Sequence, residues 1–170
     1  MSRGIEPSLL ELVGDIQSLL KLEELQSGLL TVLDRAVPSD WLPVNLMGPA
    51  PGQIRSVVRP PLSENHHVVF ARLSHENPLA QRYARTRDSR PYRFSDVISR
   101  DQLHALALYR ELYAELRVEF QIAFLIEASP DSYVAIALSR RDRDYTMGER
   151  SVLDRARPHL VQIYRNAIHR

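Results

Sequence analysis

Histidine is the residue type in this chain best suited to metal chemistry, and the chain contains six. His66 and His67 are adjacent and cannot share one face of a helix. His67 and His75 are about two helical turns apart, roughly 12 Å, which is too far for one ion. Glu64 and His67 match half of a di-iron carboxylate pattern, but such sites need a second copy and two further glutamates. We therefore expect no metal site, and we expect the histidines to lie in loops and on the surface.

Residues for covalent or nucleotide chemistry are also missing from the sequence. It contains no cysteine, which excludes disulfides, thiolate zinc sites, iron-sulfur clusters and a cysteine nucleophile. It has no G-x-S-x-G elbow, no P-loop and no G-x-G-x-x-G turn. The carboxylate pair Glu23-Glu24 falls on a solvated helical position. We expect a protein that is not an enzyme and that carries no cofactor.

An arginine-rich stretch from Arg82 to Phe94 alternates cations with aromatic residues, a composition typical of surfaces that bind single-stranded nucleic acid. Asp88 and Asp96 dilute this charge, and the net charge of the whole chain is only +1. A solvated helix end followed by a loop is the simpler interpretation. No run of about 18 apolar residues could span a bilayer, and the first residues lack a secretory apolar core. We expect a cytoplasmic protein without membrane contact.

Hydrophobic spacing predicts the elements of the first half. Apolar residues recur at intervals of three and four from Pro7 to Ala36, which indicates two helices. Trp41 to Met47 and Gln53 to Val58 are rich in strand-forming residues. Glu64 to His75 then has a helical pattern, and Asn77-Pro78 predicts a new helix start, with asparagine as the N-cap and proline in the first turn.

The second half predicts a helix, a hairpin and a last helix. Ser99 to Gln102 has the form of a capping box that opens a helix running to Leu116. In Phe120 to Ile126 and Tyr133 to Ser139, bulky residues alternate with mostly small or polar ones, which predicts two antiparallel strands. Thr146 to Glu149 is a second capping box, and Pro158 should bend the helix that it opens. The predicted fold class is α+β, with a central antiparallel sheet covered by helices on both faces.

The predicted strands have one bulky face and one face of mostly small residues. Because small residues let leucine-rich helices approach closely, we expect the N- and C-terminal helices to pack on the small face. The bulky face would then meet the helices of residues 64–116, with a ligand cavity between them. Five residues are candidates to line this cavity: His104, Tyr109, Tyr113, Ile122 and Phe124. A plain hydrophobic core is the alternative interpretation of the same residues.

From about Phe70 onward the chain resembles the amino-terminal, GAF-like sensory region of bacterial LuxR-type transcriptional regulators. The specific pieces are Asn77-Pro78-Leu79, Ser95-Asp96, Leu108-Tyr109-Arg110 and Arg157-Pro158-His159-Leu160. Two features depart from this pattern. Leu116-Arg117-Val118 stands where glycine is usual, which argues against a left-handed turn there. Asn77 replaces a histidine, to which we attach little meaning because asparagine is a good helix cap.

The resemblance implies a GAF/PAS-like single domain over residues 1–170. Residues 1–38 would form the N-terminal helices, 39–143 the sheet and ligand-side helices, and 144–170 an output helix. It also implies a cytoplasmic homodimer. DNA would be bound only through a helix-turn-helix domain, which is not present in the 170 residues. We expect the chain to be a sensory fragment, or a stand-alone relative that acts through a partner.

Two functions remain open at this stage. The first is a regulatory sensor in which a small-molecule effector or a partner changes the packing of the terminal helix, with Pro158 as a place where two geometries could arise. The second is a ligand-free homodimerisation scaffold, in which the apolar stripes of the terminal helices pair across a two-fold axis. A well-filled interior would favour the scaffold.

Overall fold

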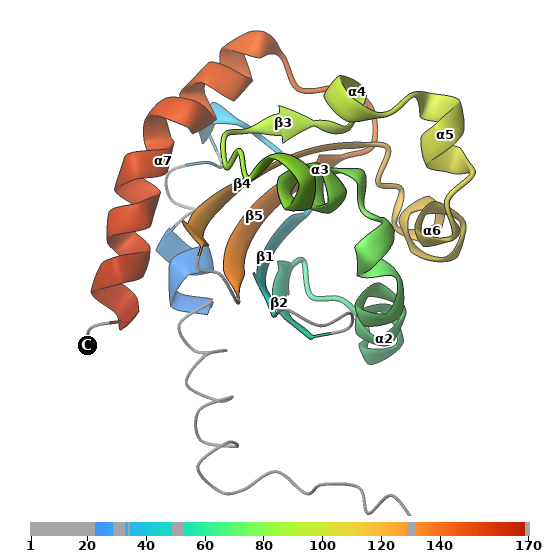
Figure 1. Ribbon diagram of the computed structural model, residues 1–170, viewed down its shortest axis with the longest axis horizontal. Helices are drawn as coiled ribbons and strands as arrows, with labels where there is room; N and C mark the ends of the chain where they lie inside the picture. The colour runs from blue at the N-terminus through green and yellow to red at the C-terminus, as the bar shows by residue number, and fades with distance from the viewer. Residues whose placement is uncertain (1–22, 29–32, 34, 49–52, 129–131, 169–170) are drawn as a thin grey trace, which may run out of the picture.

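A computed structural model describes residues 23–28, 33, 35–48, 53–128 and 132–168 (Figure 1). The predicted helix between Pro7 and Leu20 lies outside these residues. Residues 23–28, 33, 35 and 36 are helical, as the spacing of the second apolar stripe predicts.

A five-stranded sheet forms the centre of the fold, in the order β2-β1-β5-β4-β3, and every neighbouring pair is antiparallel. The strands that the alternating pattern predicts are present, and the hairpin of β4 and β5 has the expected pairing. The short edge strand β3 falls in a stretch that the sequence indicates to be a loop. The strands are β1 Leu42–Met47, β2 Ile54–Arg59, β3 Tyr92–Arg93, β4 Phe120–Ala128 and β5 Tyr133–Arg140.

Helices cover both faces of the sheet. Figure 1 shows the long helix α7 and the N-terminal helical residues on one side, and α2, α3 and α6 on the other. The predicted α+β class, with terminal helices on one face and further helices on the opposite face, is confirmed. The bounds are α2 Glu64–Leu73, η1 Ser74–Glu76, α3 Pro78–Thr86, α4 Phe94–Val97, α5 Arg100–His104, η2 Tyr109–Tyr113, α6 Ala114–Leu116 and α7 Met147–Ile168.

The assignment of helices to sheet faces is the reverse of the prediction. The terminal helices pack on the bulky face, where Leu25, Leu153 and Leu160 form one core with Ile122 and Phe124 of β4. The helices of residues 64–116 cover the small face. Burial explains this result, because large aliphatic side chains remove far more apolar area from water when leucine-rich helices cover them. The small face lacks the volume to fill the space beneath its helices.

The helix predicted from Arg100 to Leu116 is interrupted. After α5 the helix is broken at Ala105 and Leu106, resumes at Ala107 and continues into the π-helical turn η2. The backbone N–H of Leu108 donates to Glu76 Oε1 at 2.9 Å. The expectation against a left-handed turn after this helix is wrong, because Arg117 has φ 59° and ψ 42°. The N–H of Val118 bonds to the Tyr113 carbonyl at 2.8 Å, which is the closing bond of a Schellman turn. This bond holds Arg117 in a conformation that favours glycine.

Both predicted capping boxes are present. The Ser99 hydroxyl accepts from the N–H of Gln102, and the Gln102 side chain accepts from the N–H of Ser99. Thr146 and Glu149 make the same reciprocal pair at the start of α7. Helix α7 includes Pro158 and changes direction along its length in Figure 1, as expected for proline within a helix.

Candidate functional site

Two adjacent cavities lie between the small face of the sheet and the helices that cover it. Cavity A has a volume of about 60 Å³ and cavity B about 50 Å³, while one water needs roughly 10–15 Å³. The shared floor comes from the small residues of β5 and the polar residues of β1 and β4. The residues that line both cavities are Asn45, Phe70, Asn77, Gln121 and Ala137.

A buried row of hydrogen bonds runs along this floor. Asn77 Nδ2 lies 2.9 Å from the Tyr113 hydroxyl and 3.0 Å from Gln121 Oε1. Gln121 Nε2 donates in turn to the Ser139 hydroxyl at 3.0 Å. Burial raises the pKa of Tyr113 to about 12, so the hydroxyl stays neutral at physiological pH. The row therefore offers neutral donors and acceptors inside a mostly apolar space.

Asn77 has two roles in this site, and the sequence reveals only one of them. Its Oδ1 caps α3 by accepting from the N–H groups of Leu79 and Ala80, at 2.9 and 3.2 Å. Its Nδ2 donates to the buried row. The predicted cap is thus confirmed, and the asparagine also supplies a buried amide donor, which its role as a cap does not predict.

Asn77→Asp should separate the two roles. Aspartate still caps the helix, but it cannot donate to Tyr113 or Gln121, and its carboxylate would face Gln121 Oε1. We expect the free energy of unfolding at pH 7 to fall by about 2 kcal/mol, the cost of an unsatisfied buried acceptor combined with a buried charge. Urea denaturation measures this loss. Asp101→Asn in α5, which is exposed, is the control. Equal stability of Asn77→Asp and wild type would contradict the second role.

The five residues predicted to line the cavity are not brought together. Tyr113 lines cavity B. His104 and Tyr109 stack with ring centroids 4.1 Å apart and line neither cavity. Ile122 is buried beneath the terminal helices, and Phe124 borders cavity A but packs in that same core.

His104 and Tyr109 contact a different residue, Glu119. His104 Nε2 lies 2.9 Å from Glu119 Oε2, and the Tyr109 hydroxyl donates to Oε1. Burial is the main cause, and the hydrogen bond to Glu119 the second, that raises the pKa of Tyr109 to about 12. This group ties α5 and η2 to the start of β4, at a distance from the cavity floor.

The small face supplies the lining that the sequence interpretation missed. Gln121, Ala123 and Leu125 alternate with the bulky residues of β4, and all three line cavity A. Their partners across the hairpin are small, since Ala123 pairs with Ala137, and Leu125 with Ala135. The alternation of side chains along β4 identifies this face in the sequence, but it does not show which helices cover the face.

Helix α7 is hydrogen-bonded to the wall of cavity A, although it packs on the other face of the sheet. Arg157 Nη2 donates to the hydroxyl of Ser89 at 2.9 Å, and its Nε donates to the carbonyl of Leu125 at 2.6 Å. Arg150 Nε donates to the carbonyl of Pro91 at 2.7 Å. Since Ser89 and Leu125 line cavity A, the Arg157 side chain of α7 contacts the wall of this cavity directly.

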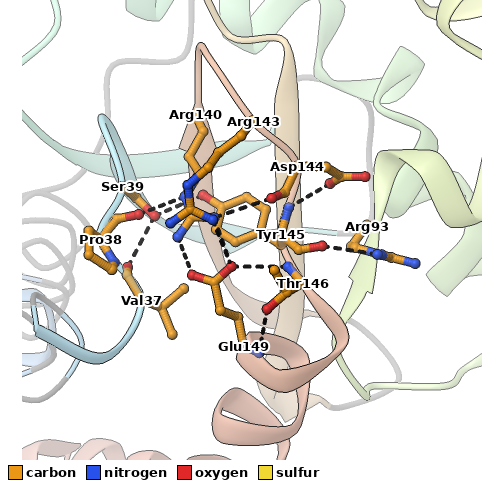
Figure 2. A network of polar contacts seen from close by, with 10 residues as sticks. All are labelled: Val37, Pro38, Ser39, Arg93, Arg140, Arg143, Asp144, Tyr145, Thr146 and Glu149. Atoms are coloured by element: carbon orange, nitrogen blue, oxygen red, sulfur yellow. Dashed lines mark hydrogen bonds and ion pairs between the residues drawn. The ribbon is translucent and has the colours of Figure 1, made fainter.

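The first turn of α7 is attached by a second group of residues, which we call the junction cluster: Pro38, Ser39, Arg140, Tyr145 and Glu149 (Figure 2). The Arg140 side chain is only 5% exposed and pairs with both oxygens of Glu149. Its Nε donates to the carbonyl of Pro38 at 2.7 Å, and the guanidinium lies 4.0 Å from the centre of the Tyr145 ring. One cation thus joins the N-terminal segment, β5 and α7.

Two hydrogen bonds extend the junction cluster. The hydroxyls of Tyr145 and Ser39 lie 2.8 Å apart. Arg93 Nη1 donates to the carbonyl of Tyr145 at 2.9 Å, which connects the cluster to β3 (Figure 2). The start of α7 is therefore held by ion pairs and hydrogen bonds, and its middle by Leu153 and Leu160 in the core.

Solved structures similar to this chain share its fold. The LBD domain of VqsR from Pseudomonas aeruginosa has 14% identity and a TM-score of 0.67, over 92% of this chain and 97% of that one. CepR2 from Burkholderia cenocepacia is an N-acylhomoserine lactone dependent LuxR family transcription factor. It has 11% identity and a TM-score of 0.55, over 91% of this chain and 89% of that one.

A third similar structure is the GAF domain of a two-component sensor histidine kinase from Bacillus halodurans. It has 12% identity and a TM-score of 0.53, over 87% of this chain and 96% of that one. No protein-family model matches the sequence, and no curated protein matches it. Within the described residues, no helix combines the length and the apolar character needed to cross a membrane. The expected likeness to the GAF-like sensory region of LuxR-type regulators is confirmed at the level of the fold.

Proposed function

We propose that this chain, which has the fold of LuxR-type and GAF sensory domains, is the sensor of a transcriptional regulator. A small molecule binds in cavity A, and its binding changes how α7 packs. The observation that carries this proposal is the double contact of Arg157, from the output helix to Ser89 and Leu125 of the cavity wall. In this proposal the chain is a cytoplasmic homodimer, and DNA is bound by a helix-turn-helix domain outside these 170 residues.

The ligand must change the equilibrium between two packings of α7. It shifts α7 only if it binds one packing of that helix better than the other. A ligand that displaces Ser89 or Leu125 satisfies this condition, because both residues hold Arg157 through their oxygen atoms. No catalytic step is part of the proposal.

The test uses protein purified from cell extract. Native mass spectrometry measures any retained small molecule and the number of subunits, and unfolding followed by refolding then removes the molecule. We expect the retained form to exchange amide hydrogens more slowly than the refolded form at the wall residues of cavity A, and at a different rate along α7. A protein that retains nothing and exchanges identically in both forms would contradict the sensor proposal.

Arg157→Gln should uncouple binding from output. The variant loses the charged contact to Ser89 and Leu125, so it should retain the same small molecule while α7 no longer changes its exchange rate. Arg155→Gln is the matched control, because Arg155 lies in the same helix, is exposed and, among the residues that the structure describes, bonds only to the carbonyl of Ser151 one turn away. An undiminished response of α7 in Arg157→Gln would rule out this route of coupling.

A homodimerisation scaffold is the second candidate. The small volumes of the two cavities favour it, since each has room for only a few waters. Native mass spectrometry separates the candidates, because a scaffold predicts a dimer without a retained molecule.

A further inference from the structure

Arg82 brings an incompletely bonded cation to the wall of cavity A. It lies on α3, and its Nε is buried without a hydrogen-bond partner among the residues that the structure describes. A buried N–H without an acceptor is costly, so each such group calls for an explanation, and a bound partner is one. A cation–π contact holds the guanidinium in place, with its Cζ 3.9 Å from the centre of the Tyr92 ring.

Asp88 forms a long ion pair with Arg82 but no hydrogen bond. Asp88 accepts from Arg90 at 3.0 Å (Nε), 2.8 Å (Nη2) and 3.1 Å (backbone N), and from the Tyr92 hydroxyl. The hydrogen bonds from Arg90 hold the pKa of Asp88 well below its usual range. The closest approach of Asp88 to Arg82 is 3.9 Å, between Oδ2 and Nη2, which is too long for a hydrogen bond.

The residues around Arg82 indicate which kind of ligand could accept a hydrogen bond from its guanidinium. Tyr83 and Tyr133 form a tilted ring pair with centroids 4.8 Å apart, and both line the cavity with Leu79. The lining of cavity A therefore combines apolar rings with the guanidinium of Arg82, next to Arg90 and Asp88, which are paired with each other. A carboxylate fits that edge, since its two oxygens match adjacent N–H groups of arginine. Recognition of a phosphate ester usually draws on several cations or a run of backbone N–H groups, and Arg90 is already paired with Asp88.

We propose that the effector is a small carboxylic acid, with its carboxylate on Arg82 and its apolar body against Tyr83 and Leu79. This inference rests on the proposed function and names the chemical class of its ligand. Because cavity A is small, the apolar body is short.

The test measures binding by protein-observed NMR titration. It compares straight-chain acids from butanoate to octanoate with hexanamide, the neutral isostere of hexanoate. We expect at least one of the acids to bind wild type, and hexanoate to bind about tenfold more tightly than hexanamide, as a charge-assisted hydrogen bond implies. Arg82→Gln should remove this preference, while Arg82→Lys should keep part of it. Arg85→Gln on the exposed side of α3 should leave it unchanged.

Three results would overturn the inference: no acid binds to wild type, hexanamide binds as well as hexanoate, or Arg82→Gln keeps the preference in a sample whose thermal unfolding shows a folded protein. Failure here is distinguishable from failure of the sensor proposal. A neutral molecule retained in native mass spectrometry, with a response in α7, would leave the sensor intact and refute only the carboxylic acid.

Discussion

Replacing Arg140 with leucine should lower the free energy of unfolding by about 3–5 kcal/mol, because it leaves the Glu149 carboxylate buried without its main partner. Glu149 is 13% exposed, and its remaining cation, Arg143, is 59% exposed and more weakly placed at 3.3 Å. The variant also frees the carbonyl of Pro38 and removes the cation from the face of Tyr145. Urea denaturation at pH 7 measures the loss.

Two further variants separate the contribution of the Arg140–Glu149 ion pair from that of the other contacts in the junction cluster. Arg141→Leu changes the neighbouring, exposed arginine and should alter stability by less than about 0.5 kcal/mol. The double variant Arg140→Leu with Glu149→Leu should be more stable than the sum of the single losses predicts, because no unpaired buried charge is left. Strict additivity of the two substitutions would show that the ion pair does not hold α7.

The pH dependence of the same contact has a defined sign. Hydrogen bonds from Arg140 lower the pKa of Glu149 from 4.5 to about 2 in the folded protein. A depressed folded-state pKa means that this stabilisation is complete above pH 4.5 and is lost as the pH falls toward 2. Arg140→Leu should therefore reduce the loss of stability that wild type suffers over that range. Parallel pH profiles of wild type and variant would contradict the assignment.

Phe124→Ala is the second substitution with a large expected effect, about 3–5 kcal/mol, because it opens a cavity in the core beneath the terminal helices. Phe124 is 2% exposed and packs in one core with Leu153 and Leu160 of α7. Amide exchange should speed up along α7 as well as in β4. Chemical denaturation combined with hydrogen exchange checks both parts.

The neighbouring residue provides the contrast. Ala123 lines cavity A, so the two added methyl groups of Ala123→Val can take up part of that cavity, and the change should cost about 1 kcal/mol or less. It should instead weaken binding of any molecule in cavity A. If Phe124→Ala abolished binding at unchanged stability, while Ala123→Val unfolded the protein, the assignment of the two sheet faces would be wrong.

Elements whose hydrogen bonds are local could be predicted from the sequence. The capping boxes at Ser99 and Thr146 connect residues three apart, so the residue types that form them reveal the helix start. The hairpin of β4 and β5 follows from the strict alternation of side chains. The LuxR-type resemblance, which the fold comparison supports, likewise depends on short blocks of residues in order.

Features held by distant residues could not be predicted. The helix break before Leu108 is stabilised by Glu76, 32 residues earlier. Strand β3 has only two residues and exists because it pairs with Ala123 and Ile122 of β4. Arg117 adopts a left-handed conformation although its residue type disfavours it, because the Val118 bond closes the turn.

The residues that share a face of each strand can therefore be read from the sequence, because the side-chain period of a strand is two. The helices that cover each face follow from the packing of the whole fold. That choice depends on the total apolar area buried by helices far apart in the chain, and it placed the leucines of the terminal helices on Ile122 and Phe124. The same choice left the cavities, with Asn77 and Arg82, on the face of small residues.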